Sequence, residues 1–149
     1  MNIELPKKNI LGVDVTDASK EDILKYITKS LGEKSDPYYI VTPNPEMIVS
    51  AKQNHSFRLI LNQARIALPD GVGLTIAASF LGKKLNERIS GTDFVELLCK
   101  EVSGKPITVG FLGGRNGVAE RAAECLLDRY PGLIVVFAEP EWTQERSIS

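Results

Sequence analysis

The sequence predicts an α/β protein with a Rossmann-like, mostly parallel sheet and helices on both of its faces. Short β-branched runs alternate with stretches in which apolar residues recur at helical spacing, which is typical of strands joined by helices. Residues 106–138 have the order strand, glycine-rich turn, helix, strand, as in a parallel β-α-β unit. The chain of 149 residues has the length of one domain, so we expect a single domain over residues 1–149.

Strands and helices alternate from the start of the chain. Strands are predicted at residues 9–16, 38–42 and 66–68, and the first can lie antiparallel at an edge. Helices are predicted at residues 19–31, from Pro45 onward, at 56–63 and at 74–81. Asn44 is placed to cap the helix that begins at Pro45, and Gly82 closes the last of these helices.

The second half of the chain continues this alternation. A helix begins near Ser90 or Thr92, either of which can cap it. A buried strand at residues 106–112 then leads through the turn 113–117 into another helix, and a strand at 133–138 follows. The predicted inward face of the helix after Ser90 consists of Phe94, Leu97, Leu98 and Val102.

Composition and charge narrow the function classes. Hydrophobic residues make up 43% and charged residues 25% of the chain, as in ordinary globular proteins. The net charge of −1 gives no positive field, so nucleic acid is not an expected partner. Cys99 and Cys125 lie in apolar helical patterns and are expected to be reduced core thiols. The N-terminus lacks a signal-peptide pattern and no apolar run reaches the roughly 18 residues of a spanning helix, so we expect a cytoplasmic protein.

Three unusual segments follow predicted strands: residues 42–46, 69–73 and 113–117. Ligands of open parallel sheets bind beyond the carboxyl ends of the strands, so the shared placement of these segments predicts a site there. Asp70 follows a strand and a proline and precedes Gly71, whose lack of a side chain would let a ligand approach the backbone. The Asp70 carboxylate is either a general base that takes a proton from an acceptor hydroxyl, or a turn residue or helix N-cap.

Other polar side chains at these positions also have two interpretations. Thr42 and Asn44 offer a hydroxyl and an amide that suit sugar hydroxyls, while Asn44 can equally cap its helix, and both roles can hold. Arg88 precedes a helix start, where a guanidinium suits a diphosphate. The ordinary alternative for Arg88 is a surface salt bridge to Glu87 or Asp93.

The turn at residues 113–117 can hold a phosphate or a ribose on its backbone amides. It is not a P-loop, because no Gly-Lys-Ser/Thr follows, and it does not match Gly-x-Gly-x-x-Gly. Glu139 lies 22 residues beyond Gly117, about where a dinucleotide-binding fold places its ribose-binding acid. A nicotinamide- or flavin-binding protein is therefore the main rival interpretation.

Taken together, these segments resemble the WecG/TagA/CpsF glycosyltransferases in order and spacing. The motifs that carry the resemblance are residues 42–46 (TPNPE), 64–73 (ARIALPDGVG), 87–93 (ERISGTD), 111–114 (FLGG) and 117–119 (GVA), within a match over about residues 9–138. The resemblance implies an inverting, metal-independent transferase on the Rossmann-like arrangement called GT-E, with no cofactor. The family includes enzymes that move N-acetylmannosamine from a UDP donor to undecaprenyl-diphosphate-linked N-acetylglucosamine in teichoic acid biosynthesis, so the resemblance implies this or a related sugar transfer.

The resemblance also implies a role for each site residue. By position, Asp70 is the general base, and Thr42, Asn44, Gly71, Thr92 and Asp93 belong to the substrate pocket. Arg88 meets a diphosphate. Gly113, Gly114, Asn116 and Gly117 form the nucleotide side, and no metal ligand is implied.

The resemblance further implies that related chains continue past residue 149, through a strand and a basic tail that reaches the membrane. On this interpretation the chain lacks the C-terminal portion of the family, residues 141–149 match no family motif, and contact with the inner face of the cell membrane depends on the missing part. We also expect a homo-oligomer, because an exposed sheet edge or apolar face would seek a partner. The alternatives are a non-catalytic relative that binds the acceptor or a partner protein, and the nicotinamide-binding protein.

Overall fold

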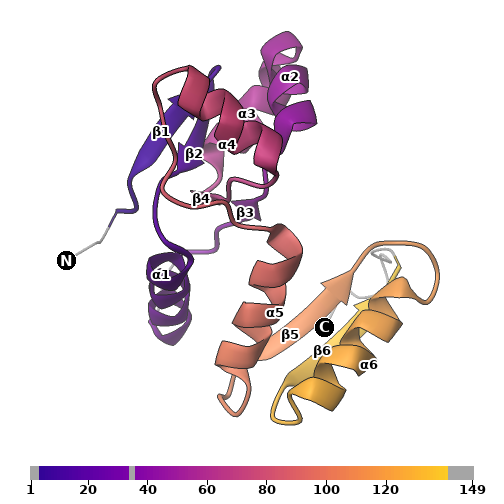
Figure 1. Ribbon diagram of the computed structural model, residues 1–149. Coiled ribbons are helices and arrows are strands. Elements are labelled where there is room, and N and C mark those ends of the chain that lie inside the picture. The colour runs from indigo at the N-terminus through magenta and orange to yellow at the C-terminus, as the bar shows by residue number, and fades with distance from the viewer. Residues whose placement is uncertain (1–3, 34–35, 141–149) are drawn as a thin grey trace. The chain divides into compact units, whose positions relative to one another are not determined.

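The computed structural model describes residues 4–33 and 36–140 (Figure 1). The chain divides into two compact units, a first unit of residues 1–94 and a second unit of residues 95–149. Helix α5, Gly91–Val102, begins in the first unit and continues into the second. The segment 141–149, which matched no family motif, lies outside the described residues. Among the residues that are described, no helix is long and apolar enough to cross a membrane.

The first unit begins with an antiparallel hairpin, so the prediction of one strand over residues 9–16 is wrong. β1, Lys7–Ile10, pairs with β2, Val13–Thr16, and the chain reverses through Leu11 and Gly12. Both turn residues have positive φ, 51° and 95°, as the two-residue turns that match the twist of a hairpin require. A two-residue turn preserves the alternation of apolar and polar positions, so the sequence resembles one continuous strand.

A short parallel pair lies beside this hairpin. β3, Ile40–Val41, pairs in parallel with β4, Ile66–Ala67, which confirms the predicted parallel arrangement with shorter strands than expected. The backbone N–H of Ala67 donates to the hydroxyl of the fully buried Thr16 at 2.9 Å. This bond links β4 to β2, so the hairpin and the parallel pair are held together by a buried hydrogen bond with no access to competing water.

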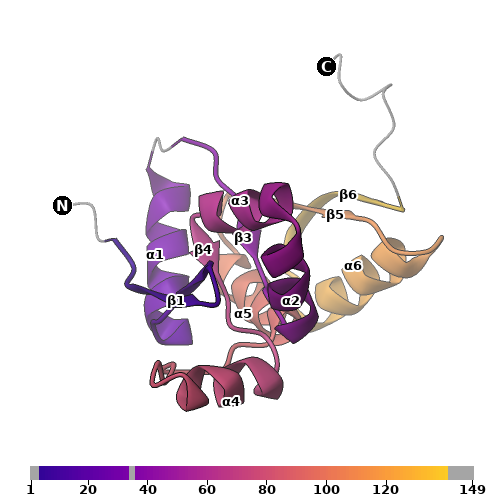
Figure 2. The same cartoon turned by 90° about the horizontal axis from the view of Figure 1, so that it is seen from above.

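Four complete helices pack in the first unit (Figure 2). They are α1 (Lys20–Gly32), α2 (Pro45–Gln53), α3 (His55–Gln63) and α4 (Val72–Phe80). Asn44 caps α2, as predicted, because its side chain accepts from the N–H of Met47 at 2.9 Å. The core of the unit joins the hairpin to α2, α3, α4 and the loop after α4, and consists of Ile10, Val13, Val15, Ile48, Ala51, Leu61, Leu74, Ala78 and Leu85.

The second unit contains the predicted β-α-β unit. β5 (Thr108–Leu112) and β6 (Ile134–Glu139) are parallel, and α6 (Val118–Arg129) connects them. Cys99 on α5 is buried in the core of this unit, and its burial, followed by the charge of Glu96, raises the pKa of its thiol. Cys125 is exposed, so the prediction of a second core thiol is wrong. It lies two positions after the buried Ala123, which places it on the opposite side of α6.

The α/β, Rossmann-like class is confirmed by these helices and parallel strand pairs. Among the described residues, hydrogen bonds join the strands in three pairs, β1 with β2, β3 with β4, and β5 with β6. The expectation of a single domain over residues 1–149 stays a prediction.

Candidate active site

The ends of β3 and β4 bring two of the predicted segments side by side. Beyond the strands, the N–H of Leu68 donates to the carbonyl of Val41 at 2.8 Å, and the N–H of Asp70 donates to the carbonyl of Pro43 at 3.1 Å. The parallel pairing therefore continues as a backbone ladder past the two strands. Pro43 is fully buried, so the segment that carries Thr42 is fixed next to the one that carries Asp70.

The Asp70 carboxylate lies at the N-terminus of α5. Its Oδ2 accepts from the backbone N–H of Gly91 at 3.2 Å, and the N–H of Ile89 donates to the carbonyl of Pro69 at 3.0 Å. A carboxylate at a helix N-terminus interacts favourably with unpaired N–H groups and with the helix dipole. The alternative role of Asp70 as cap of the next helix is wrong, because the N-cap of α4 is Gly71, without a side-chain bond.

Thr42 and Asp70 both pack closely against Gly91. A Cβ built on Gly91 would lie 2.8 Å from Cγ2 of Thr42 and 3.4 Å from Oδ2 of Asp70. The structure thus brings Thr42, Asp70 and the start of α5 together, as their placement predicted for the first two. Sequence reasoning missed Gly91 as a site residue. The available signal was a glycine that opens a helix between Ser90 and Thr92, two residues with better capping side chains.

Glycines also shape the loop after Asp70. Gly71 has a φ of 93°, a left-handed conformation that favours glycine. A Cβ on Gly73 would lie 3.0 Å from Cγ of Pro45, so this part of α4 packs tightly against the start of α2. Gly71, predicted to let a ligand approach, therefore has a conformational role as well, and it fixes the direction in which the chain leaves the site.

The remaining polar candidates of the first unit surround this centre. Asn44 uses its Oδ1 as the cap of α2, while its Nδ2 donates to none of the described residues. Thr92 and Asp93 are exposed in the first turn of α5, directly after Gly91. Their side chains are therefore accessible to a ligand, and their substrate roles stay predictions.

Arg88 is exposed and does not form the surface salt bridge to Glu87 or Asp93 that was the alternative interpretation of this residue. Within residues 4–33 and 36–140, its guanidinium makes no ion pair or hydrogen bond. Glu87 instead pairs with Lys20, at 3.5 Å between Nζ and Oε1, and also accepts from the backbone N–H of Lys20 at 3.0 Å. Arg88 thus presents an uncompensated positive charge three residues before the start of α5.

The predicted nucleotide turn belongs to the second unit. Gly113, Gly114 and Gly117 have φ values of 108°, 82° and 82°, and the N–H of Gly113 donates to the carbonyl of Glu139 at 2.9 Å. Gly117 is the N-cap of α6 without a side-chain bond, and Asn116 is exposed. The N–H groups of Gly113 and Val118 already donate to backbone carbonyls, so a ligand oxygen would meet the other N–H groups of the turn and of the start of α6. The nucleotide role of these residues stays a prediction.

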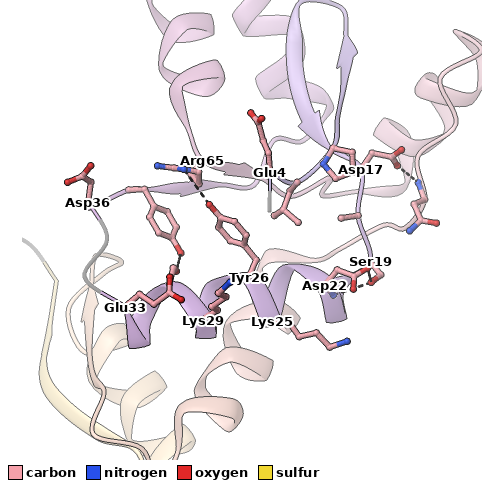
Figure 3. Close-up of a pocket in the computed structure, with 16 residues that line it drawn as sticks. Glu4, Asp17, Ser19, Asp22, Lys25, Tyr26, Lys29, Glu33, Asp36 and Arg65 are labelled. Carbon is pink, nitrogen blue, oxygen red and sulfur yellow. Dashed lines mark hydrogen bonds between the residues drawn. The ribbon is translucent and has the colours of Figure 1, made fainter. Parts of the chain in front are cut away.

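A cavity of about 770 Å³ lies along α1 and contains none of the predicted site residues (Figure 3). In its wall the rings of Tyr26 and Tyr38 meet edge to face at 6.4 Å between centroids, and the Arg65 guanidinium lies 5.6 Å from the Tyr38 centroid. Across the cavity, burial of Asp17 would raise the pKa of its carboxyl. The ion pair with Lys8 at 2.7 Å and the N–H of Asn86 outweigh burial and lower this pKa. The charge of Asp17 at this cavity is thus compensated by Lys8.

We expect Gly91→Ala to lower the free energy of unfolding by about 1–3 kcal/mol, because the new methyl group overlaps the Thr42 side chain. The displaced Thr42 and Asp70 should also reduce any transferase activity. Gly32→Ala is the matched control, since a Cβ at Gly32, the last residue of α1, meets nothing within 4 Å. Urea denaturation of both variants measures the difference. Equal stability of the two variants would contradict the close approach at Gly91.

The fold and this site define an α/β protein with a carboxylate set beyond two parallel strands, as in enzymes that act on sugars or nucleotides. The family model of the glycosyl transferase WecG/TagA/CpsF family matches residues 8–148, and the chain belongs to this family. The match extends beyond the resemblance seen in the motifs, which ended near residue 138.

Curated relatives carry a more specific name. A protein of Bacillus spizizenii is 29% identical over 126 residues, which are 85% of this chain and 49% of the relative. A protein of Staphylococcus aureus is 30% identical over 128 residues, 85% of this chain and 50% of the relative. Both are named N-acetylglucosaminyldiphosphoundecaprenol N-acetyl-beta-D-mannosaminyltransferase. The chain spans about half the length of these relatives.

Proposed function

We propose that this chain supplies the catalytic base of an inverting glycosyltransferase. The enzyme moves an N-acetylmannosamine-type sugar from UDP to N-acetylglucosamine on a polyprenyl diphosphate, in the synthesis of a teichoic acid-type surface polymer at the inner face of the cell membrane. Family membership and the names of the relatives support the reaction class and the acceptor. The observation that carries the proposal is the Asp70 carboxylate, held by the Gly91 N–H beside Thr42.

The two oxygens of Asp70 have different tasks in this proposal. Oδ2 is held by the N–H of Gly91, whereas Oδ1 accepts no hydrogen bond from the part of the chain that the structure describes. Oδ1 takes the proton of the attacking acceptor hydroxyl. The acceptor oxygen then forms a bond to C1 of the donor sugar, while the bond between C1 and the UDP oxygen breaks and its electron pair leaves with UDP. One displacement inverts the configuration at C1.

Neighbouring groups orient the sugars and stabilise the leaving charge. The Thr42 hydroxyl and the Nδ2 of Asn44 lie on the same segment and can bind sugar hydroxyls, while Asn44 keeps its capping role. Negative charge grows on UDP as it leaves, so donors fixed before the reaction lower the barrier. We propose that the turn 113–117 binds the nucleotide, and that Arg88 contacts the diphosphate of the polyprenyl acceptor.

The proposal is tested by incubating the protein with UDP-N-acetylmannosamine and a prenyl-diphosphate-linked N-acetylglucosamine, and measuring UDP release and disaccharide formation. We expect product in EDTA and no increase with magnesium, because the proposed transferase is metal-independent. Calorimetric titration with UDP and with NAD(H) separates this activity from a dinucleotide-binding role. Binding of NAD(H) without binding of UDP would contradict the proposal.

A further inference from the structure

Helix α4 is apolar on two faces, only one of which is buried. Leu74 and Ala78 face the core and are almost fully buried. On the outward face, Val72, Ile76 and Phe80 are 51%, 50% and 88% exposed. These three residues are spaced by four, so they form one continuous stripe along the helix.

Such a stripe differs from the single apolar residues found on most protein surfaces. A contiguous exposed apolar strip is typical of a binding surface. The hydroxyls of Thr75 and Ser79 donate to carbonyls of α4 itself, so they do not interrupt the strip with unpaired donors. The outward face of α4 therefore indicates a ligand or partner with a hydrophobic part.

The chain after α4 turns this stripe into a groove of about 490 Å³. The residues that line it include the apolar Ile76, Phe80 and Leu85, the basic Lys84 and Arg88, and the polar Thr75, Ser79 and Asn86. Glu87 also lines the groove, but its charge is compensated by Lys20. The groove thus combines exposed apolar side chains of α4 with positive charge, which suits an anionic amphiphile.

Both segments that line the groove are close in sequence to residues of the candidate active site. α4 begins two residues after Asp70, and the segment with Arg88 continues into Gly91, whose N–H holds the Asp70 carboxylate. An anionic ligand can therefore place its charged group at Arg88 and its apolar chain along Ile76 and Phe80. Both of these segments are joined by a few residues to Asp70 or to Gly91, which holds the Asp70 carboxylate.

We propose that this groove binds a polyprenyl diphosphate, with the diphosphate at Arg88 and the first isoprene units along Ile76 and Phe80. The proposal rests on the proposed function for the role of the lipid as acceptor carrier, but its test does not require transfer. The nine residues of α4 span about 13 Å, so the groove takes only the part of the chain nearest the diphosphate.

The test compares two ligands with the same head and different tails. The protein is titrated in a calorimeter with dimethylallyl diphosphate and with farnesyl diphosphate, the latter below its micelle concentration. We expect farnesyl diphosphate to bind on the order of tenfold more tightly or better, since its extra isoprene units lose contact with water. Phe80→Ser and Ile76→Ser should remove most of this gain, while Arg88→Gln should weaken both ligands.

Ile60→Ser is the matched control, because Ile60 on α3 is 53% exposed, like Ile76, but does not line the groove. This variant should keep the preference for the longer tail, and circular dichroism should show that all variants remain folded. Farnesol, which has the tail without the head, should bind much more weakly than farnesyl diphosphate.

Several results would overturn the inference. Equal binding of the two diphosphates, equal effects of Ile60→Ser and Ile76→Ser, or full affinity in Arg88→Gln would each do so. A different outcome is that the native protein shows no preference for the longer tail. If Phe80→Ser then abolished sedimentation with anionic vesicles, α4 would be a membrane-binding surface, and if it dissociated a dimer, α4 would be a self-association surface. Tail-dependent binding by a protein without transfer activity would leave this inference standing and refute the proposed function alone.

Discussion

Replacing Asp70 with asparagine is expected to lower the rate of sugar transfer by a factor on the order of 10²–10⁴, the usual contribution of a positioned general base. The amide keeps the shape of the carboxylate, and its oxygen can still accept the hydrogen bond from the N–H of Gly91. It has no oxygen basic enough to take the proton of the acceptor hydroxyl. The fold and the binding of UDP should therefore be retained while turnover is lost, which initial rates of UDP release would measure.

The control for this experiment is Asp36→Asn, the same change at an exposed aspartate that takes no part in the proposed site. It should leave the rate unchanged. Full turnover by Asp70→Asn, with stability unchanged, would remove Asp70 as the base.

Local patterns predicted much of this fold. The capping role of Asn44 follows from its position before Pro45, because an N-cap bond spans only three residues. The β-α-β unit of the second half follows equally from the order of its segments. The hairpin over residues 7–16 was missed, since a two-residue turn leaves the alternation of side chains unbroken.

The sequence predicted only the part of the candidate site that is formed by the ends of neighbouring strands. Thr42 and Asp70 follow strands that prove to be parallel neighbours, so their approach could be inferred. The bond from Gly91 to Asp70 joins residues 21 positions apart and depends on where α5 begins in space, which no sequence period records. The same holds for the cavity wall of Tyr26, Tyr38 and Arg65, whose parts come from separate segments.

The largest effect on stability is expected for a substitution on the buried face of α4. We expect Leu74→Ala to lower the free energy of unfolding by about 2–5 kcal/mol, because Leu74 is 1% exposed and its removal leaves a cavity in the core of the first unit. Ile76→Ala, two positions along the same helix, should change it by no more than about 0.5 kcal/mol, since half of that side chain already contacts water.

Urea denaturation followed by circular dichroism measures both values on one helix, with similar changes in side-chain volume. The comparison matters for function, because the same orientation that buries Leu74 turns Ile76 and Phe80 toward the groove with Arg88. A large loss of stability in Ile76→Ala would mean that protein already covers this face of α4. The groove would then be closed to a prenyl chain, whereas a loss confined to Leu74→Ala leaves the outward stripe available for a ligand.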